Sequence, residues 1–240
     1  MPPNSGNWSR REQNRGLVSV MSVRVKICGI KDYRAAAAAV DAGADAVGFV
    51  LYGPSARKVA PETAKKIIDA LPPFVITVGV FVNAPLEVVR KITSFCGLNV
   101  VQLHGREPPD FCRKVGTRVI KAFRVKKTAE HEADSEQGCF TVSETELESV
   151  NRYPVDALLF DAYAPHAVGG TGRTFDWTVL AGKKFRLPVI LAGGLNPQNV
   201  AAAVRMVRPY AVDVSSGVES NGEKDTAKIK DFIRQAKGVI

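Results

Sequence analysis

From Val23 onward the chain alternates between two hydrophobic patterns. Short runs of consecutive apolar residues, many of them β-branched, are each followed by a longer amphipathic stretch. Strands that are buried on both faces of a parallel sheet give the first pattern, and helices packed on that sheet give the second. The apolar runs predict eight strands, at residues 23–28, 46–50, 74–81, 99–103, 117–123, 155–161, 187–191 and 211–214.

The stretches between these runs predict eight helices, several of which carry end signals. An Ala-rich helix ends at Gly43, and Pro61 opens the next one at the first helical position. The helices are expected at residues 32–42, 61–70, 85–95, 108–115, 144–151, 176–180, 197–207 and 225–236, with a polar, irregular loop at 124–138. Eight such units in 240 residues predict an α/β protein, a single-domain (β/α)₈ TIM barrel. No GxGxxG follows the first strand, which argues against a dinucleotide-binding fold.

Residues 1–21 stand apart from this pattern. They are polar and lack the apolar segment of a secretory signal, and Met21 lies just before the first strand. We expect residues 1–21 to be a disordered extension, or the product of an early start codon, and residues 22–240 to be the catalytic barrel. No apolar run approaches the roughly 20 residues of a membrane span.

The composition is ordinary for a soluble protein, with 45% hydrophobic and 24% charged residues. The four cysteines form no CxxC pair and the three histidines are dispersed, so we expect no metal site and a reduced, cytoplasmic location. A net charge of +9 is spread along the chain without a dense cluster or an aromatic stacking motif. We therefore expect neither a nucleic-acid nor a membrane partner, although the basic surface would help to attract an anionic substrate.

Reactive or polar residues follow most of the predicted strands. In a barrel of this kind the active site lies where the strands end and the βα loops begin. Any one of these residues could be an ordinary polar loop residue, but the set is larger than a core requires. Its members are Cys28, Arg57, Asn83, Gln102, His104, Asp161, Gly193, Gly194, Ser215, Ser216 and Gly217.

Two turns after the seventh and eighth strands predict a phosphate site. One contains Gly193 and Gly194, and the other contains Ser215, Ser216 and Gly217. Glycines let backbone N–H groups approach an anion, and loops at these two positions are the usual phosphate cradle of the fold. For the glycine pair, a tight turn without a ligand is the alternative.

A further glycine-rich stretch follows the sixth strand and contains Gly170 and Gly172. It lacks the spacing of a P-loop. We expect a mobile active-site loop there, with a plain surface linker as the alternative.

Eight motifs, in order and at every strand end, together resemble the phosphoribosylanthranilate isomerase family. KICGI and VSSGVE together are specific, whereas a glycine pair alone is not. Departures from the pattern are the N-terminal extension and the polar stretch 126–138. The motifs are KICGI at 26–30, ADAVGF at 44–49, SAR at 55–57, GVFVN at 79–83, VQLHG at 101–105, GGTG at 169–172 with FDW at 175–177, GGLN at 193–196 and VSSGVE at 214–219.

The resemblance implies a cofactor-independent Amadori rearrangement in tryptophan biosynthesis, from N-(5-phosphoribosyl)anthranilate to 1-(o-carboxyphenylamino)-1-deoxyribulose 5-phosphate. It implies that Cys28 is the general base, that Asp161 is the general acid, and that Arg57 holds the anthranilate. We also assign Gln102 and His104 to substrate binding. Ring opening needs a proton on the ring oxygen, which Asp161 would supply if partial burial kept it protonated. Cys28 would then act as a thiolate, which requires nearby cationic charge that lowers the pKa of the thiol.

Two other classes of function remain open on the sequence alone. Another phosphate-binding barrel, such as an indole-glycerol-phosphate synthase or a thiamine-phosphate synthase, would need a catalytic lysine or a pyrophosphate and magnesium site. Because strand side chains alternate between faces, we expect Lys26 to point away from Cys28, so that at most one of them faces the barrel interior. No acidic cluster suits magnesium. A non-catalytic phosphate or nucleic-acid binder would leave the cysteine and aspartate at strand ends unexplained. The sequence does not decide between a monomer and a homodimer.

Overall fold

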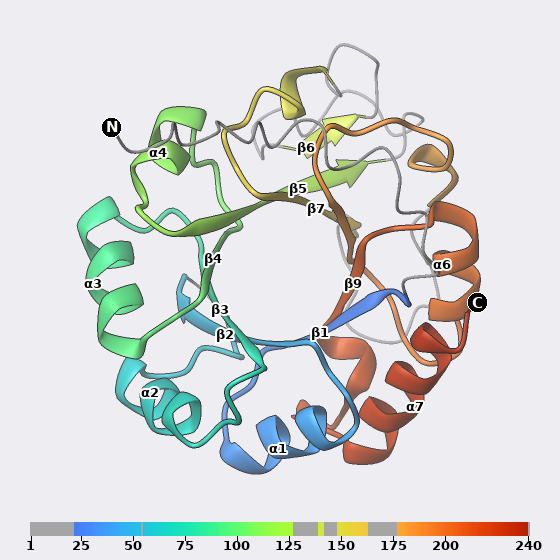
Figure 1. Ribbon diagram of the computed structural model, residues 1–240, viewed down its shortest axis with the longest axis horizontal. Helices are drawn as coiled ribbons and strands as arrows, with labels where there is room; N and C mark the ends of the chain where they lie inside the picture. The colour runs from blue at the N-terminus through green and yellow to red at the C-terminus, as the bar shows by residue number, and fades with distance from the viewer. Residues whose placement is uncertain (1–21, 54, 127–138, 142–147, 163–176, 240) are drawn as a thin grey trace, which may run out of the picture.

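A computed structural model describes residues 22–53, 55–126, 139–141, 148–162 and 177–239. Within them, eight parallel strands form a closed ring that is surrounded by helices (Figure 1). The neighbour order is β4-β3-β2-β1-β9-β8-β7-β5, and pairing of β5 with β4 closes the ring. The predicted (β/α)₈ barrel is confirmed.

The barrel strands are β1 (Arg24–Cys28), β2 (Ala46–Tyr52), β3 (Ile76–Phe81), β4 (Val100–Leu103), β5 (Arg118–Lys126), β7 (Ala157–Ala162), β8 (Val189–Leu191) and β9 (Ala211–Val214). The helices around them are α1 (Tyr33–Asp41), α2 (Pro61–Asp69), α3 (Leu86–Cys96), α4 (Pro109–Lys114), α6 (Val200–Val207) and α7 (Thr226–Lys237), with residues 148–150 also helical. Short 3₁₀ turns are η2 (Trp177–Val179) and η3 (Ser216–Val218). Outside the ring, β6 (Cys139–Thr141) pairs with β5, and β10 (Glu219–Ser220) pairs with β11 (Glu223–Lys224).

Local end signals explain several of these helices. The Asp32 side chain accepts a hydrogen bond from the first turn of α1, and Asp225 does the same for α7. Pro61 opens α2, and Gly97 ends α3 in the left-handed conformation. At these ends, local sequence signals set where the helix begins or stops.

The apolar core has two parts. The larger part lies between the strand ring and the helices and includes the fully buried side chains of Phe49, Phe81, Phe123 and Phe232. A smaller cluster contains the alternate strand residues that fill the ring itself, which are Val78, Ile120, Ala122, Ala157, Leu159, Ile190, Ala192 and Ala211. Successive side chains of a strand point alternately to the barrel interior and to the helices, which separates the two parts. The interior side chains of each strand lead up to the residues at its carboxyl end, where the active site of this fold lies.

Several predicted elements differ from the structure in their bounds or type. Strand β5 continues to Lys126, where the sequence predicts a loop from Arg124, because it pairs with both β6 and β7 there. The third strand begins at Ile76, and Phe74 before it is 97% exposed. Helix α6 begins at Val200 rather than at residue 197, because hydrogen bonds among Asn196, Gln198 and Asn199 hold a turn there. The predicted helix at 176–180 is the 3₁₀ turn η2.

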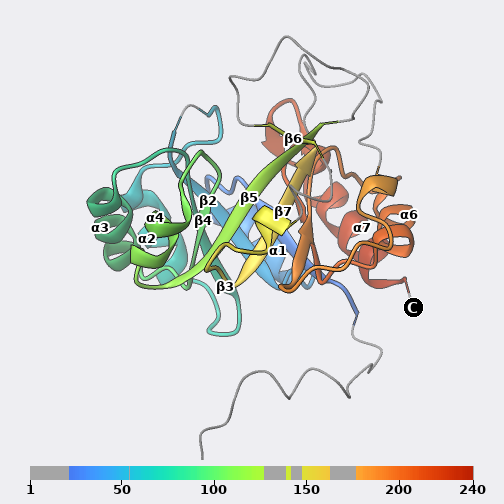
Figure 2. The same cartoon turned by 90° about the horizontal axis from the view of Figure 1, so that it is seen from above.

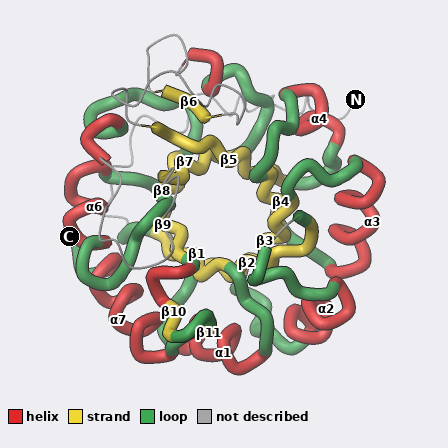
Figure 3. Tube along the Cα trace, turned by 180° about the vertical axis from the view of Figure 1, so that it is seen from behind, coloured by secondary structure: helices red, strands yellow, loops and turns green. Residues whose placement is uncertain are grey.

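Figure 2 shows β5 and β7 from the side, running toward the same end of the barrel. Seen from behind in Figure 3, the β10–β11 hairpin lies outside the ring near α1 and α7. Lys31, just after β1, donates a hydrogen bond to Glu223 of this hairpin over 2.8 Å. The hairpin is thereby tied to the loop that follows Cys28.

Several predictions fall outside the described residues, namely those for residues 1–21, for most of 144–151, and for Gly170 and Gly172 in the predicted active-site loop. In the part of the chain that the structure describes, no helix is long and apolar enough to cross a membrane.

Candidate active site

The predicted base lies on the interior face of β1. Cys28 is 7% exposed and packs with Val50 and Val80 of the neighbouring strands. A Cβ added to Gly48 of β2 would stand 3.0 Å from the Cys28 Sγ and 3.2 Å from the Lys26 Nζ. Glycine at this position therefore leaves the space that the thiol and the ammonium share.

The prediction that Lys26 points away from Cys28 is wrong. Residues two positions apart in a strand lie on the same face, so both side chains face the barrel interior. Lys26 donates hydrogen bonds to Asp213 over 3.0 Å and to Gln102 over 2.8 Å. Asp213 lies beside Lys26 in the register of β1 and β9.

The pKa of the Cys28 thiol is shifted in the direction opposite to the one expected from the sequence. Burial raises the pKa of the Cys28 thiol above its usual range and outweighs the lowering by Lys26 and Lys224, while the Asp213 carboxylate raises it further. The cations that the sequence argument requires are present, but the predicted lowering of the pKa is not found. The ligand-free thiol therefore holds its proton at neutral pH.

The predicted acid is held by a histidine. Asp161 lies on β7 with its Oδ2 3.2 Å from the His104 Nε2. The amide Nε2 of Gln102 lies 3.0 Å from the His104 Nδ1, and the Gln102 Oε1 accepts from Lys26. Because the amide nitrogen can only donate, Nδ1 accepts, and the ring proton lies on Nε2 and points to Asp161. The structure thus brings the predicted acid and base to one end of the barrel. Hydrogen bonds link the predicted acid to Lys26, whose ammonium borders the same space as the Cys28 thiol.

Arg57 lies in the loop after β2, and its guanidinium is held by the carboxylate of Glu219, which is 162 positions away in the sequence. Its Nε and Nη2 each donate to Glu219 over 2.7 Å, and Lys224 donates to the same carboxylate over 2.7 Å. Burial raises the pKa of Glu219, but the bonds from Arg57 and Lys224 outweigh it and leave that pKa below its usual range. Among the described residues, none accepts a hydrogen bond from the Arg57 Nη1, so the outer edge of the guanidinium is available for a second carboxylate.

The two turns predicted to bind phosphate, in the loops after β8 and β9, lie in close backbone contact. Gly193 and Gly194 both have positive φ, at 83° and 68°. A Cβ on Gly217 would overlap the carbonyl oxygen of Leu195, so only glycine lets the loop after β9 lie this close to the loop after β8. Around Gly194, by contrast, a Cβ would meet nothing within 4 Å. A side chain at this position would therefore meet open space among the described residues.

Ser215 connects these turns to the base. Its Oγ donates to the Cys28 backbone oxygen over 3.0 Å, and Lys224 donates to the Ser215 carbonyl over 2.9 Å. The predicted phosphate turn and the predicted base are therefore neighbours at the ends of β9 and β1.

A buried ion pair that the sequence analysis missed supports the loop after β4. Glu107 accepts hydrogen bonds from the Asn83 N, the Gly105 N and the Lys121 Nζ over 2.8, 3.0 and 2.9 Å. Asn83, which the sequence placed among candidate site residues, thus organises the loop that carries His104. Strand parity could have revealed Lys26, and Glu219 ends the VSSGVE motif without a role being assigned to it there, but no local pattern marks Glu107 or Lys224.

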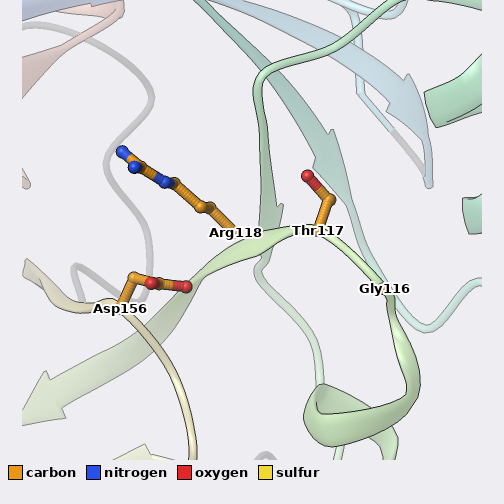
Figure 4. Close-up of a pocket in the computed structure, with 4 residues that line it drawn as sticks. All are labelled: Gly116, Thr117, Arg118 and Asp156. Carbon is orange, nitrogen blue, oxygen red and sulfur yellow. The ribbon is translucent and has the colours of Figure 1, made fainter. Parts of the chain in front are cut away.

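A surface hollow at the opposite end of the barrel has no part in this site. Figure 4 shows its lining residues, Gly116, Thr117, Arg118 and Asp156, at the amino ends of β5 and β7. The Asp156 carboxylate accepts from the backbone N of Val119 over 2.9 Å, which accounts for it structurally. Among the described residues, no cluster of three or more His, Cys, Asp or Glu side chains is placed to hold a metal ion.

Comparisons with known protein families and with curated proteins give a consistent result. A family model described as "N-(5'phosphoribosyl)anthranilate (PRA) isomerase" matches residues 25–235. Similar curated proteins carry the name N-(5'-phosphoribosyl)anthranilate isomerase. The one from Desulforudis audaxviator is 53% identical over 90% of this chain and 98% of its own length, and the one from Geobacter metallireducens is 53% identical over 90% and 99%.

Solved structures give the same result. The phosphoribosyl anthranilate isomerase of Thermotoga maritima aligns with a TM-score of 0.77 and 45% identity, over 90% of this chain and 99% of its own. A phosphoribosyl anthranilate isomerase in complex with reduced 1-(o-carboxyphenylamino)-1-deoxyribulose 5-phosphate aligns with a TM-score of 0.74 and 43% identity, over 90% and 99%.

Proposed function

Because this chain belongs to the phosphoribosylanthranilate isomerase family and is an isomerase of tryptophan biosynthesis, we propose that Cys28 is its general base and Asp161 its general acid. The observation that carries the proposal is their placement on β1 and β7, with one hydrogen-bonded set of side chains between them. The name of the complexed neighbour supports a phosphorylated deoxyribulose as the product.

Two of the proton transfers in the rearrangement are assigned to side chains at this end of the barrel. Asp161 gives a proton to the furanose ring oxygen as the bond from that oxygen to C1′ breaks, and a protonated Schiff base forms. The Cys28 thiolate then takes the proton from C2′, and the electron pair of that bond forms the enolamine. Tautomerisation to the ketone completes an isomerisation in which nothing is oxidised or reduced overall. The two assigned transfers use acid–base groups of the chain, and the tautomerisation only moves a proton from the C2′ hydroxyl to C1′. We therefore propose that no cofactor takes part.

Turnover of phosphoribosylanthranilate by the purified chain, followed as loss of substrate fluorescence, tests this function directly. Loss of fluorescence with formation of the deoxyribulose phosphate supports it. Turnover of an indole-glycerol-phosphate synthase substrate instead would favour another barrel enzyme, and phosphate binding without any turnover would favour a binding protein.

Arg57→Ala is expected to raise KM about tenfold or more with a smaller change in kcat, because a charged hydrogen bond to a carboxylate contributes about 1.5–3 kcal/mol. We propose that the outer edge of the guanidinium holds the anthranilate carboxylate while Glu219 holds the inner edge. Arg57→Lys is the matched control, since it keeps the charge but loses the planar fork. Unchanged KM and kcat in Arg57→Ala would show that Arg57 serves Glu219 alone.

We propose that the turns of Gly193–Gly194 and Ser215–Gly217 bind the substrate phosphate through backbone N–H groups. Ligand-free crystals grown in phosphate or sulfate should show the anion there. Gly194→Val is expected to weaken inhibition by inorganic phosphate more than Lys224→Met does, because a β-branched residue is strained at a φ of 68°. The space around Gly194 is open, so the effect would come from the backbone and not from a clash. The reverse order of effects would mean that side-chain charge holds the anion.

The family match to residues 25–235 supports the proposal that residues 22–240 form the catalytic domain. We propose a cytoplasmic location, which three free cysteines among the described residues support. A solved neighbour is described as monomers generated from the dimeric enzyme of Thermotoga maritima. Light scattering of this chain would distinguish a monomer from a homodimer.

A further inference from the structure

A continuous set of side chains crosses the barrel between the proposed base and the proposed acid. It begins at Cys28, beside which the Lys26 ammonium lies. Lys26 donates to Gln102, Gln102 donates to His104, and His104 donates to Asp161, over 2.8, 3.0 and 3.2 Å. Each of these three hydrogen bonds runs from donor to acceptor in the direction of Asp161, and Lys26 donates in addition to Asp213.

The side chains of Lys26 and Gln102 are deeply buried, although polar groups at these positions are not required for the stability of the barrel. Lys26 is 4% exposed and Gln102 is 1% exposed. Elsewhere the ring is filled by Ala, Val, Ile and Leu side chains. Replacing a buried ion pair with apolar side chains of similar volume is often neutral or stabilising, so the Lys26–Asp213 pair is not needed to fill the space.

We propose that Lys26 and Gln102 are positioning residues of the rearrangement, Lys26 for the thiolate of Cys28 and Gln102 for the histidine that holds Asp161. This inference rests on the proposed roles of Cys28 and Asp161. The ammonium lies where it stabilises negative charge on the sulfur once the thiol has lost its proton. The Gln102 amide holds His104 in the tautomer that donates to one carboxyl oxygen, which leaves the other oxygen to deliver a proton to the substrate.

The charged groups around Cys28 come from four elements. Lys26 of β1 and Lys224 of β11 favour the thiolate, and Asp213 of β9 opposes it. Arg57, in the loop after β2, also interacts electrostatically with Cys28, although Glu219 has the larger effect on the pKa of its guanidinium. Lys26 exerts a larger effect on the thiol than Lys224 or Asp213, so its removal should dominate any variant of this group.

The first test measures Cys28 without any substrate. In Lys26→Met, the rate constant for alkylation of Cys28 by iodoacetamide at pH 8, followed by peptide mass spectrometry, is expected to fall about tenfold. Removing a nearby opposite charge raises a thiol pKa by about one to three units. The greater nucleophilicity of the more basic thiolate offsets part of that loss. The double variant Lys26→Met/Asp213→Asn leaves no unpaired buried charge and should show a smaller fall, so the result can be read even if Lys26→Met does not fold.

The matched control is another buried ion pair. Lys121 and Glu107 are as deeply buried as Lys26 and Asp213. The Lys121 side chain, however, lies on the outer face of β5, opposite to the interior residues Ile120 and Ala122. In Lys121→Met/Glu107→Gln, the alkylation rate constant of Cys28 should stay within about twofold of the native value. An equal fall in this control, or an unchanged rate constant in both Lys26 variants, would overturn the role of Lys26.

The second test concerns Gln102. Gln102→Met should leave Cys28 alkylation unchanged, lower kcat about tenfold or more, and leave KM nearly the same, because positioning of an acid affects the transition state. The chain has three histidines, so ¹⁵N-labelled histidine resolves the ring of His104 by NMR. Native His104 should carry its proton on Nε2, and Gln102→Met should lose that preference.

A native His104 tautomer protonated on Nδ1, or an unchanged kcat in Gln102→Met, would overturn the role of Gln102. Neither the alkylation rate nor the tautomer requires that Cys28 and Asp161 be the catalytic pair. A fully active Cys28→Ser variant would therefore refute the proposed role of Cys28 as the base, while these two measurements would still report on Lys26 and Gln102.

Discussion

Cys28→Ser is expected to lower turnover of phosphoribosylanthranilate by about 10²–10⁴-fold while the fold stays intact. Serine fills nearly the same volume, so the packing with Val50 and Val80 is retained. Its hydroxyl is far less acidic than a thiol, so an alkoxide is scarcely available near neutral pH. The base is therefore lost without a cavity or a clash that could unfold the barrel.

The pH dependence of the native chain adds a second readout to this variant. Because burial raises the pKa of the Cys28 thiol, the thiolate fraction of the ligand-free chain grows as the pH rises through and above the usual range of a thiol. The kcat/KM of the native chain should rise with pH over that range, and the residual activity of Cys28→Ser should not show this rise.

The matched control is a second buried free cysteine. Cys112 lies in α4, and burial raises the pKa of its thiol to about 11. Cys112→Ser removes a buried thiol outside the barrel interior and should keep most of the native turnover. Near-native activity in Cys28→Ser would remove this residue from the mechanism.

The barrel could be predicted from the sequence because both of its signals are local. Runs such as that in β2 are apolar along their whole length, as burial on both faces demands, and Pro61 and Gly97 mark helix ends within a few residues. The errors occur where pairing at a distance decides the outcome. Strand β5 extends to Lys126 because β6 and β7 both pair with it, and the residues of that segment alone do not show this.

The positions of the candidate site residues could also be predicted, because strand ends converge in a barrel whatever the side chains are. Their partners could not. Lys26 and Asp213 are 187 positions apart and Arg57 and Glu219 are 162 apart, and each pair meets because strands or loops from the two halves of the sequence are neighbours in the ring. The net effect on the Cys28 thiol likewise depends on how burial balances charges from several elements.

Asp161→Asn is expected to lower kcat by about 10²–10⁴-fold, because an amide cannot deliver a proton to the ring oxygen of the substrate. The geometry makes this substitution a clean test. The amide oxygen of asparagine can still accept the hydrogen bond that the His104 Nε2 gives to the Asp161 Oδ2, so the side chain should keep its place. KM should consequently change much less than kcat, as measured by steady-state fluorescence kinetics.

The control for this variant is the aspartate at the other end of the same strand. Asp156 lies before β7, where its carboxylate accepts from the Val119 backbone, and an asparagine there can make the same bond. Asp156→Asn should therefore keep near-native kcat, although it also replaces an aspartate by an asparagine at an end of β7. If Asp161→Asn retains more than about a tenth of the native rate, which is well above what loss of an acid or base leaves, the proton comes from another group. His104 would then be the first candidate, since its Nε2 proton already points into this end of the barrel.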